Sequence, residues 1–173
     1  IGGMDTLEFN SAVTSGITLD LGVGHEQTVH ANLGLRLIRG HAIENVLGSA
    51  EDDVITGNSL DNRLEGRGGD DTLEGGLGND TYAFDADSAL GGDALTEDSV
   101  EGGVDTLDFS GTSGQSVQVS LVPSTAQIVN ANLTVTLTRG GAFENLVGGA
   151  QGDTLTGNDN DNTIDGGAGA DTL

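Results

Sequence analysis

The sequence contains no lysine, no cysteine and no tryptophan, and it has a single proline, Pro123. Its five basic residues are all arginines, against 28 aspartates and glutamates, which gives a formal net charge of −23. Nucleic acids and anionic membranes are bound through basic surfaces, so this balance argues against both as direct partners. No apolar run is long enough to span a bilayer. The absence of cysteine is compatible with any redox compartment.

Bulky residues are also scarce, since aromatic residues make up only 3% of the 173 residues, whereas glycine accounts for 30. A chain this acidic and this poor in large apolar side chains repels itself, and composition alone indicates disorder. A strict periodicity of glycine and acidic positions indicates instead a chain that becomes ordered when cations neutralise its charge.

Residues 44–82 repeat a nine-residue pattern, in which an apolar residue follows each acidic or amide residue by two positions and glycines open the turns. The acidic or amide positions are Glu44, Asp53, Asn62, Asp71 and Asp80, and the apolar positions are Val46, Ile55, Leu64, Leu73 and Tyr82. Nine residues are too few for a strand, a helix and a return. They fit a six-residue glycine turn followed by a three-residue strand with one inward side chain.

Two such units make a coil of eighteen residues with one strand in each of two stacked sheets, so equivalent turns stack on the same edge. The first edge carries Asp53 and Asp71, and the second carries Glu44, Asn62, Asp80 and, one position away, Asp61. Carboxylates stacked about 4.8 Å apart repel one another unless a cation neutralises them. Carboxylate and carbonyl oxygens without sulfur or clustered imidazole favour Ca²⁺ over zinc, copper or Mg²⁺.

The clearest unit is residues 75–83, GGLGNDTYA, which fits the calcium-binding nonapeptide G-G-x-G-x-D-x-U-x at every fixed position. The chain therefore resembles the RTX (repeats-in-toxin) family. This resemblance implies a parallel β-roll that binds several Ca²⁺ ions, export by the bacterial type I route, and folding outside the cell. The sequence departs from the family pattern at Asn62 and Asn162, which replace the expected aspartate in turns that also lack two glycines.

A longer repeat encloses the nonapeptides. Residues 1–73 return as residues 101–173 with an offset of 100 and no insertion, and about two in five positions are identical. The repeated segments include 2–9, which return as 102–109, and 42–48, which return as 142–148. This regularity predicts a solenoid array, of which the sequence is a fragment.

Each long unit begins with a part that lacks glycine turns and alternates apolar and polar residues, as at Ile17–Leu21 and Leu33–Leu37. Period-two alternation indicates half-buried strands, and no stretch has helical periodicity. We therefore expect an all-β, right-handed parallel β-solenoid with almost no helix, in which wide coils lead into a tight β-roll. A separate small β-sandwich before each roll is the alternative.

The expected organisation has three parts. A first unit covers 1–84, with wide coils over 1–47 and the nonapeptide roll over 48–84. Residues 85–100 form an acidic connection, with one further coil around Ala94–Leu95. A second unit covers 101–173, with wide coils over 101–147 and a roll over 148–173.

The predicted metal ligands are the carboxylates, amides and turn carbonyls of the two rolls. They are Asp53, Asp71, Asp80, Asp61, Asn62, Glu44, Gly66, Gly68, Gly76, Gly78, Asp153, Asp171, Asp161, Asn162 and Glu144. A solvated position at the rim explains Glu44 and Glu144 equally well. Asp5 and Asp105 lie in abbreviated turns, where a turn-stabilising side chain is the commoner reading.

Other polar residues point to no chemistry. The histidines His25, His30 and His41 are replaced in the second copy, so neither a catalytic nor a metal-binding role is expected. Arg39 and Arg139 recur and are interpreted as charge partners of the acidic rim. Known hydrolase, metalloprotease and phosphate-loop motifs are absent, so no enzyme activity is expected.

The sequence thus predicts a calcium-binding structural module of a large secreted bacterial protein, covalently continuous with further repeats. The alternative is an accessory β-roll of an extracellular enzyme, such as a protease, lipase or alginate epimerase. In that role it would aid folding or bind an extracellular polysaccharide or surface target.

Overall fold

The structure, a computed structural model, describes residues 3–9, 14–37, 43–97, 103–122, 126–138 and 142–173. Within these residues the regular elements are all β-strands. No helix in this part of the chain is long and apolar enough to cross a membrane.

The first sheet has seven parallel strands that stack in the order of the chain, with one or three other strands between successive members in the sequence. Its strands are β1 (Thr6–Glu8), β5 (Asn45–Leu47), β7 (Arg63–Glu65), β9 (Thr81–Ala83), β11 (Thr106–Asp108), β15 (Asn145–Val147) and β17 (Thr163–Asp165). Five of the seven come from the two rolls or from the short strand that leads into each roll, and β1 and β11 come from the wide coils. The short length of each strand matches the three-residue x-U-x segment that the nonapeptide predicts.

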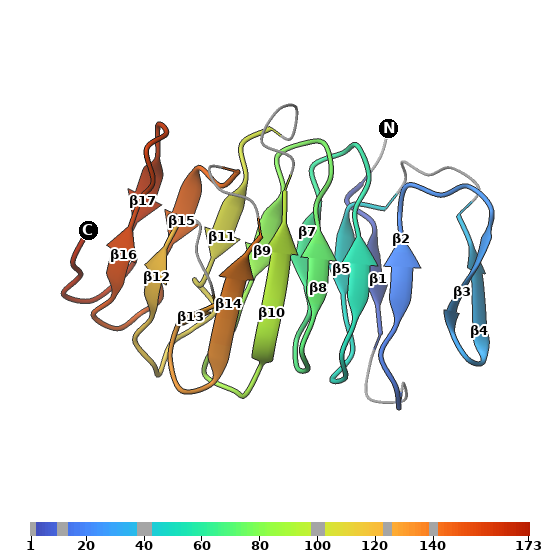
Figure 1. Cartoon of the computed structure of the whole chain (residues 1–173), viewed down its shortest axis with the longest axis horizontal. Helices are drawn as coiled ribbons and strands as arrows, with labels where there is room; N and C mark the ends of the chain where they lie inside the picture. The colour runs from blue at the N-terminus through green and yellow to red at the C-terminus, as the bar shows by residue number, and fades with distance from the viewer. Residues whose placement is uncertain (1–2, 10–13, 38–42, 98–102, 123–125, 139–141) are drawn as a thin grey trace.

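The second sheet contains the strands of the opposite side of each coil. Its order is β13 (Gln127–Ile128), β14 (Leu133–Leu137), β10 (Gly91–Thr96), β8 (Thr72–Glu74), β6 (Val54–Thr56) and β2 (Thr18–Asp20), with only β13 antiparallel. A further parallel pair, β12 (Gln118–Ser120) and β16 (Thr154–Thr156), continues the same row toward the C-terminus (Figure 1). The two rows face each other along the long axis of the molecule, which confirms the all-β parallel roll.

The wide coils are part of this solenoid. Strand β1 pairs in parallel with β5, and β2 pairs in parallel with β6, so the first wide part stacks directly on the first roll. The second wide part does the same through β11 with β15 and β12 with β16. A separate β-sandwich before each roll is therefore not what the chain forms.

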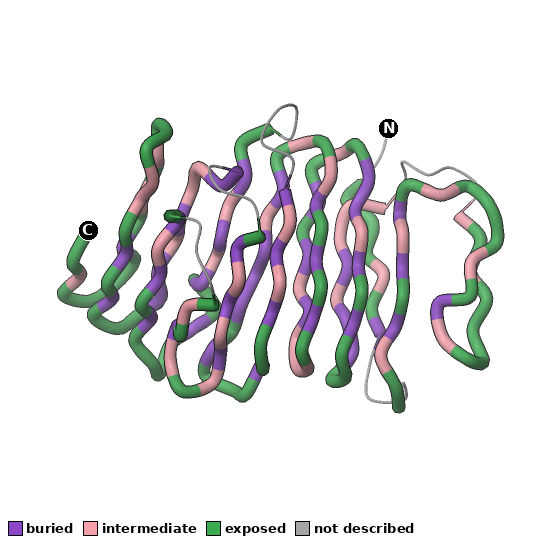
Figure 2. Tube along the Cα trace, viewed as in Figure 1, coloured by how far each residue is buried: buried purple, intermediate pink, exposed green. Residues whose placement is uncertain are grey.

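The core consists of one inward side chain from each short strand. Val46, Ile55, Leu64, Leu73 and Tyr82 are all fully buried, as the nonapeptide pattern predicts. Figure 2 shows the resulting alternation of buried and exposed positions along neighbouring strands. In the last coil Ile164 is half-buried and Leu173 is exposed, because no described coil covers them.

Residues 85–97 hold the further coil that was expected around Ala94–Leu95. Strand β10 pairs in parallel with β8 on one side and with β14 on the other, so it is an interior strand of the second sheet. Leu95 is fully buried, and its carbonyl accepts a hydrogen bond of 3.0 Å from the Thr138 N–H. The acidic segment therefore continues the solenoid from one unit into the next.

The two copies of the long repeat differ at one strand. In the second copy, β14 lies against β10, and Leu133 is only 2% exposed. Its counterpart in the first copy, β4 (Leu33–Arg36), forms an antiparallel hairpin with β3 (Glu26–His30) at the N-terminal end of the row (Figure 1). Leu33 is 40% exposed there. The leucine at this position of the repeat is thus buried where β10 lies beside its strand and exposed where no such strand is described.

Candidate metal centre

One edge of the roll carries a column of buried carboxylates. The Oδ1 atom of Asp71 accepts a hydrogen bond of 2.8 Å from the Asp53 N–H, eighteen residues earlier in the chain. Asp93 Oδ1 accepts one of 3.1 Å from the Asp71 N–H, and Asp53 Oδ1 accepts one of 2.8 Å from the Ile17 N–H. These three carboxylates are each at most 2% exposed. The structure therefore brings Asp53 and Asp71 together as predicted and adds Asp93 to their column.

The opposite edge repeats this arrangement. Asp80 Oδ1 accepts a hydrogen bond of 2.7 Å from the Asn62 N–H, and Asp105 Oδ1 accepts one of 2.8 Å from the Asp80 N–H. Glu144 Oε2 in turn accepts one of 2.9 Å from the Asp105 N–H. Glu44 takes the same position in the first copy, where its Oε2 accepts a hydrogen bond of 2.8 Å from the Asp5 N–H. Both glutamates are therefore members of the column and not merely solvated rim residues.

The turn glycines allow the coils to come this close. Gly76 and Gly78 have φ angles of 101° and 119°, which side chains rarely tolerate. A Cβ atom at Gly78 would also lie 2.5 Å from the Leu60 carbonyl oxygen of the preceding coil. Both glycines were predicted as carbonyl ligands. What the structure shows is that their lack of a side chain lets neighbouring turns stack.

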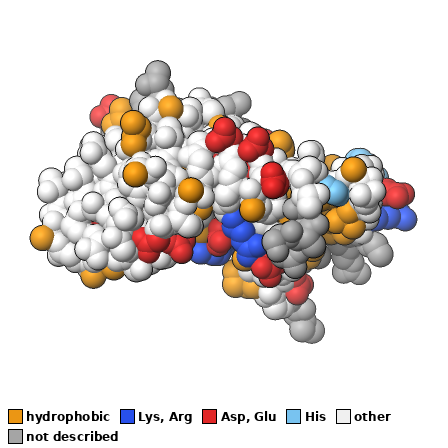
Figure 3. Space-filling model, turned by 90° about the horizontal axis from the view of Figure 1, so that it is seen from below, with side chains coloured by type: hydrophobic (Ala, Val, Ile, Leu, Met, Phe, Trp, Pro, Cys, Tyr) orange, Lys and Arg blue, Asp and Glu red, His pale blue; other side chains and the backbone are white. Residues whose placement is uncertain are grey.

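One turn uses an arginine where the second copy has glycine. Arg67 has a φ of 76°, close to the 77° of Gly167, its counterpart. Its guanidinium donates to Glu8 at 2.6 Å and to the Gly48 carbonyl at 3.3 Å. These contacts hold the residue in a conformation that costs an ordinary side chain free energy. Arg63 forms a separate ion pair with Asp108 at 3.0 Å. Figure 3 shows basic side chains beside carboxylates on one face of the molecule.

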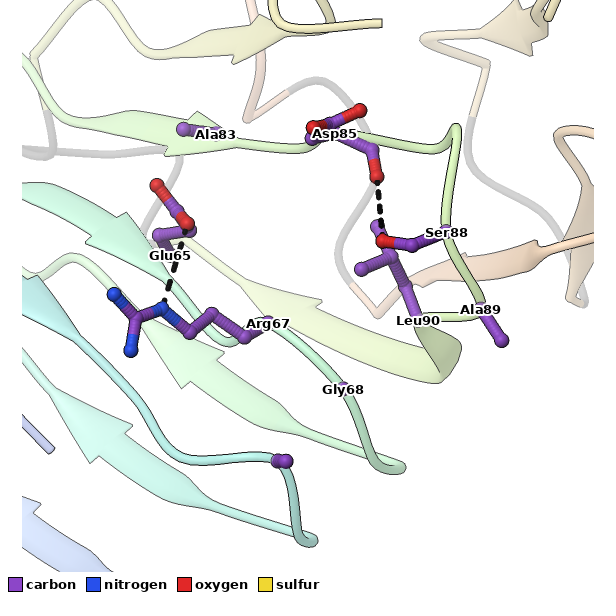
Figure 4. Close-up of a pocket in the computed structure, with 9 residues that line it drawn as sticks. Glu65, Arg67, Gly68, Ala83, Asp85, Ser88, Ala89 and Leu90 are labelled. Carbon is purple, nitrogen blue, oxygen red and sulfur yellow. Dashed lines mark hydrogen bonds and ion pairs between the residues drawn. The ribbon is translucent and has the colours of Figure 1, made fainter. Parts of the chain in front are cut away.

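A cleft of about 330 Å³ adjoins this turn. Glu65, Arg67, Asp85 and Gly68 are among the residues that line it, and the Arg67 Nε atom lies 3.7 Å from Glu65 (Figure 4). The carboxylates of the two columns do not line the cleft. Gly68, a predicted carbonyl ligand, therefore lies at a surface hollow and beside the column rather than within it.

Two oxygen atoms of the columns are left without a donor. Asp71 Oδ2 and Asp80 Oδ2 are buried and have no hydrogen-bond partner in the part of the chain that is described. Asp71 Oδ2 packs against Gly66 and Asp80 Oδ2 packs against Gly75, so closely that a Cβ atom on either glycine would clash with the oxygen. A buried carboxylate oxygen with no donor carries a large desolvation cost, which a coordinated cation removes. Both atoms are therefore candidate metal ligands among the described residues.

Other predicted ligands already have donors. Both oxygens of Asp53 accept hydrogen bonds, Oδ2 from the Ser49 N–H at 2.6 Å and Oδ1 from the Ser49 hydroxyl at 2.8 Å. Asn62 Oδ1 accepts from the Asn58 N–H at 2.8 Å, and its Nδ2 donates to the Glu44 carbonyl at 3.2 Å. Asn62 therefore fills its corner without an ion, which is what an amide in place of the expected aspartate permits.

In the second roll the first column recurs. Asp171 Oδ1 accepts a hydrogen bond of 2.9 Å from the Asp153 N–H, and Asp153 Oδ2 accepts one of 2.7 Å from the Gly149 N–H. Asn162 Oδ1 accepts one of 2.8 Å from the Asn158 N–H. Asp161 is exposed. Its counterpart Asp61 uses Oδ1 to accept from the Asn79 N–H at 2.8 Å, which places it in an outer column of turn caps.

Burial raises the pKa of the inner carboxyls. Removal from water raises the pKa of Asp71 to about 8. The hydrogen bond from the Asp53 N–H lowers this pKa, and the charge of Asp93 raises it. Burial likewise raises the pKa to about 7 for Asp80 and Asp93, and to about 6 for Asp105. Without a cation these groups hold protons near neutral pH, and a divalent ion has to displace those protons.

Acidification should therefore stabilise the metal-free fold. Because the folded pKa values lie above the ordinary aspartate pKa of 3.8, this contribution is largest below pH 3.8 and is lost as pH rises to about 8. In excess chelator we expect β-type circular dichroism and the melting temperature to increase from pH 8.5 to pH 5.5. In calcium the trend should reverse, since protons compete with the ion. A metal-free fold that is less stable at pH 5.5 than at pH 8.5 would contradict this assignment.

Sequence reasoning missed Asp93 and Glu97 near these sites, and it considered Asp105 as a possible ligand but preferred a turn-stabilising role. Asp93 and Asp105 occupy column positions, but they follow Asp71 and Asp80 by 22 and 25 residues and not by 18. Each still precedes an apolar residue by two positions, and that D-x-U signal alone would have identified them. Glu97 joins Asp80 and Asp105 in a buried group, in which one oxygen of each lies within 4.8 Å of the others. It has no sequence signal.

The remaining expectations concern basic residues. His25 is exposed, and His30 lies partly buried in the β3–β4 hairpin, away from both columns. His41, Arg39 and Arg139 lie outside the described residues.

Stacked carboxylates along both edges of a parallel two-sheet roll define a calcium-binding β-roll. Hard oxygen ligands at glycine turns suit Ca²⁺, and the unpartnered oxygens of Asp71 and Asp80 fit such an ion. The family model of the RTX calcium-binding nonapeptide repeat (4 copies) matches residues 47–82 and 139–173, which are the two rolls. Both segments match this family model, which identifies them as RTX nonapeptide repeats, and repeats of this kind bind Ca²⁺. No curated protein matches the chain.

Proposed function

We propose that the chain is a calcium-dependent structural module of a large exported bacterial protein, and that it folds when it binds Ca²⁺ outside the cell. The observation that supports this is the pair of buried, unpartnered oxygens, Asp71 Oδ2 and Asp80 Oδ2. They oppose folding when no ion is present and favour it when an ion is bound. RTX repeats are typical of secreted proteins, which meet millimolar calcium only after export.

The energetics are consistent with such a switch. Extracellular calcium modules have dissociation constants of about 10⁻⁴ to 10⁻³ M. A site at ten times its dissociation constant adds about 1.4 kcal/mol to the free energy of unfolding. A few sites of this strength amount to the whole stability of a small domain, which is about 5–15 kcal/mol.

Calorimetric titration tests the proposal. We expect several Ca²⁺ ions to bind each chain with a large heat that accompanies folding, and Mg²⁺ at the same concentration to give little. Mg²⁺ requires tight octahedral geometry and loses water reluctantly, so it fits glycine turns poorly. An absence of calcium binding at millimolar concentration would rule the function out. Proposed ligands for this experiment are Asp71, Asp80 and Asp171, together with the turn carbonyls around them.

We further propose that the module is one part of a longer array of the same 100-residue unit. Support comes from β4, whose counterpart β14 is covered by β10 while β4 exposes Leu33. Neither an enzyme activity nor the accessory role beside a catalytic domain is favoured by a specific contact or cleft, so we do not propose them.

The array has a direct test. Fusing a second copy of residues 43–100 ahead of Ile1 supplies a β10-type strand at the spacing that β14 sees. We expect the amides of Leu33–Leu37 to become protected from hydrogen exchange, and Leu33→Ala to change from nearly neutral to destabilising by about 2–5 kcal/mol. Leu133→Ala in the unfused chain is the matched reference. A fusion in which the hexapeptide Gly91–Thr96 is replaced by Gly and Ser should give no protection, and equal results from both fusions would refute the array.

A further inference from the structure

The nonapeptide turns obey a rule that involves two neighbouring coils. In each turn, a Cβ atom added to the leading glycine would clash with an Oδ atom of the Asp or Asn five residues later. In several turns this Cβ atom would also clash with the carbonyl oxygen of the glycine eighteen residues later. The sets are Gly48 with Asp53 and Gly66, Gly57 with Asn62 and Gly75, and Gly148 with Asp153 and Gly166. The N–H of the same glycine donates to a backbone carbonyl of the next coil at 2.7–2.8 Å.

The second oxygen differs at Gly75, where the next coil has no nonapeptide turn. A Cβ atom at Gly75 would still clash with Asp80 Oδ2, but the second oxygen that it would meet is Oε1 of Glu97 and not a glycine carbonyl. The N–H of Gly75 donates to the Tyr82 hydroxyl at 2.6 Å instead of to a backbone carbonyl. Glu97 and Tyr82 therefore supply with side chains the two oxygens that a regular turn supplies with its backbone.

The same contacts hold Glu97 in place. The Tyr82 hydroxyl bonds Glu97 Oε1 and lies 3.1 Å from the Thr96 carbonyl oxygen. Glu97 is 1% exposed, although glutamate side chains are seldom fully buried unless they are paired. A buried glutamate fixed in this position by a buried tyrosine holds its carboxylate close to those of Asp80 and Asp105.

The structure assigns Glu97 to a composite calcium site with Asp80 and Asp105, in which it replaces a turn carbonyl at the end of the first roll. All three carboxylates are at most 1% exposed, and one oxygen of each lies within 4.8 Å of the others. Asp80 Oδ2 is buried there without a hydrogen-bond partner. Glu97 and Asp105 lie outside the matched repeat segments. This inference rests on the proposed calcium function and adds a site that the nonapeptide pattern does not contain.

Charge sets the expected affinity of this site. A regular turn offers backbone carbonyls and the carboxylate of its own aspartate, whereas this site gathers three carboxylates. Calcium affinity rises with the number of charged ligands. The Glu97 site should therefore fill before the regular turns, so that the end of the first roll becomes ordered early in a calcium titration.

The single tyrosine makes the site observable. The chain has one tyrosine and no tryptophan, so Tb³⁺ emission that is excited through tyrosine reports an ion near Tyr82. We expect wild-type protein to show tyrosine-sensitised Tb³⁺ emission at the first equivalent of metal, and Ca²⁺ to displace it. In E97Q this emission should be lost, and calorimetry should find one Ca²⁺ ion fewer per chain. The matched control is E74Q, because Glu74 is an exposed glutamate at the end of a neighbouring strand.

The outcomes separate this inference from the function on which it rests. Wild-type protein that binds no Ca²⁺ overturns both. E97Q that binds as many ions as wild type, with unchanged emission, overturns the Glu97 site alone. If E97Q does not fold in calcium, Tb³⁺ emission from the wild-type protein is the deciding measurement. Wild-type protein that binds Tb³⁺ without tyrosine-sensitised emission overturns the Glu97 site.

Discussion

Removing calcium at pH 7.5 is expected to abolish most of the β-type circular dichroism of this protein, and adding Ca²⁺ back should restore it. The reason is electrostatic, because the chain carries a formal charge of −23 and places four carboxyls with raised pKa values inside two columns. Only about one inward side chain per short strand opposes this repulsion. A hydrophobic core of this kind does not offset the free-energy cost of burying several carboxyls, whether each is ionised or holds a proton above its ordinary pKa.

The size of the protein in solution provides a second readout of the same change. In excess chelator the hydrodynamic radius should increase toward that of an unfolded chain, and it should fall again as Ca²⁺ is added. The control is Mg²⁺ at equal concentration, which screens charge to the same extent but fits the turns poorly. Full β signal and a compact radius in excess chelator at pH 7.5 would show that the roll stands without its ions.

Substituting Asp71 by asparagine should change stability in opposite directions with and without calcium. The amide oxygen of Asp71→Asn can still accept from the Asp53 N–H, as Asn62 accepts from the Asn58 N–H in the equivalent turn. The substitution removes the buried charge and the metal ligand together. In calcium we therefore expect one bound ion fewer and a loss of at least about 1.4 kcal/mol.

In chelator the same variant should be more stable than wild type. At pH 7.5, keeping the Asp71 carboxyl buried costs roughly 2–4 kcal/mol, because its folded pKa of about 8 lies far above its ordinary value of 3.8. The neutral amide avoids this cost. The control is Asp52→Asn, since Asp52 is an exposed turn cap whose Oδ1 accepts from the Asp70 N–H at 2.8 Å. Thermal unfolding in both buffers measures the two effects, and a loss of stability in both would remove Asp71 from the list of ligands.

Much of the fold could be predicted because its physics is local. An apolar residue two places after each acidic one specifies which side chain enters the core, and Val46, Ile55 and Leu64 do so. The eighteen-residue coil follows from the same spacing and places Asp71 beside Asp53. The eighteen-residue spacing does not hold where the connection between columns is longer, so Asp93 was not predicted and Asp105 was interpreted as a turn-stabilising residue.

The candidate site was less predictable than the fold. Whether a carboxylate is free to bind an ion depends on the donors around it, and those donors come from other turns. Ser49 satisfies Asp53, whereas nothing described does so for Asp71 Oδ2. Leu33 and Leu133 illustrate the same limit, because these two leucines occupy equivalent positions of the repeat and differ in burial according to the strand beside them.

The most direct test of the account is a crystal structure grown in millimolar calcium, with anomalous differences measured at a wavelength where Ca²⁺ scatters anomalously. The account predicts peaks within coordination distance of Asp71 Oδ2 and Asp80 Oδ2, at about 2.3–2.6 Å. Turns at Asp71 and Asp80 that show no such peaks, with both oxygens hydrogen-bonded to protein or water, would contradict it.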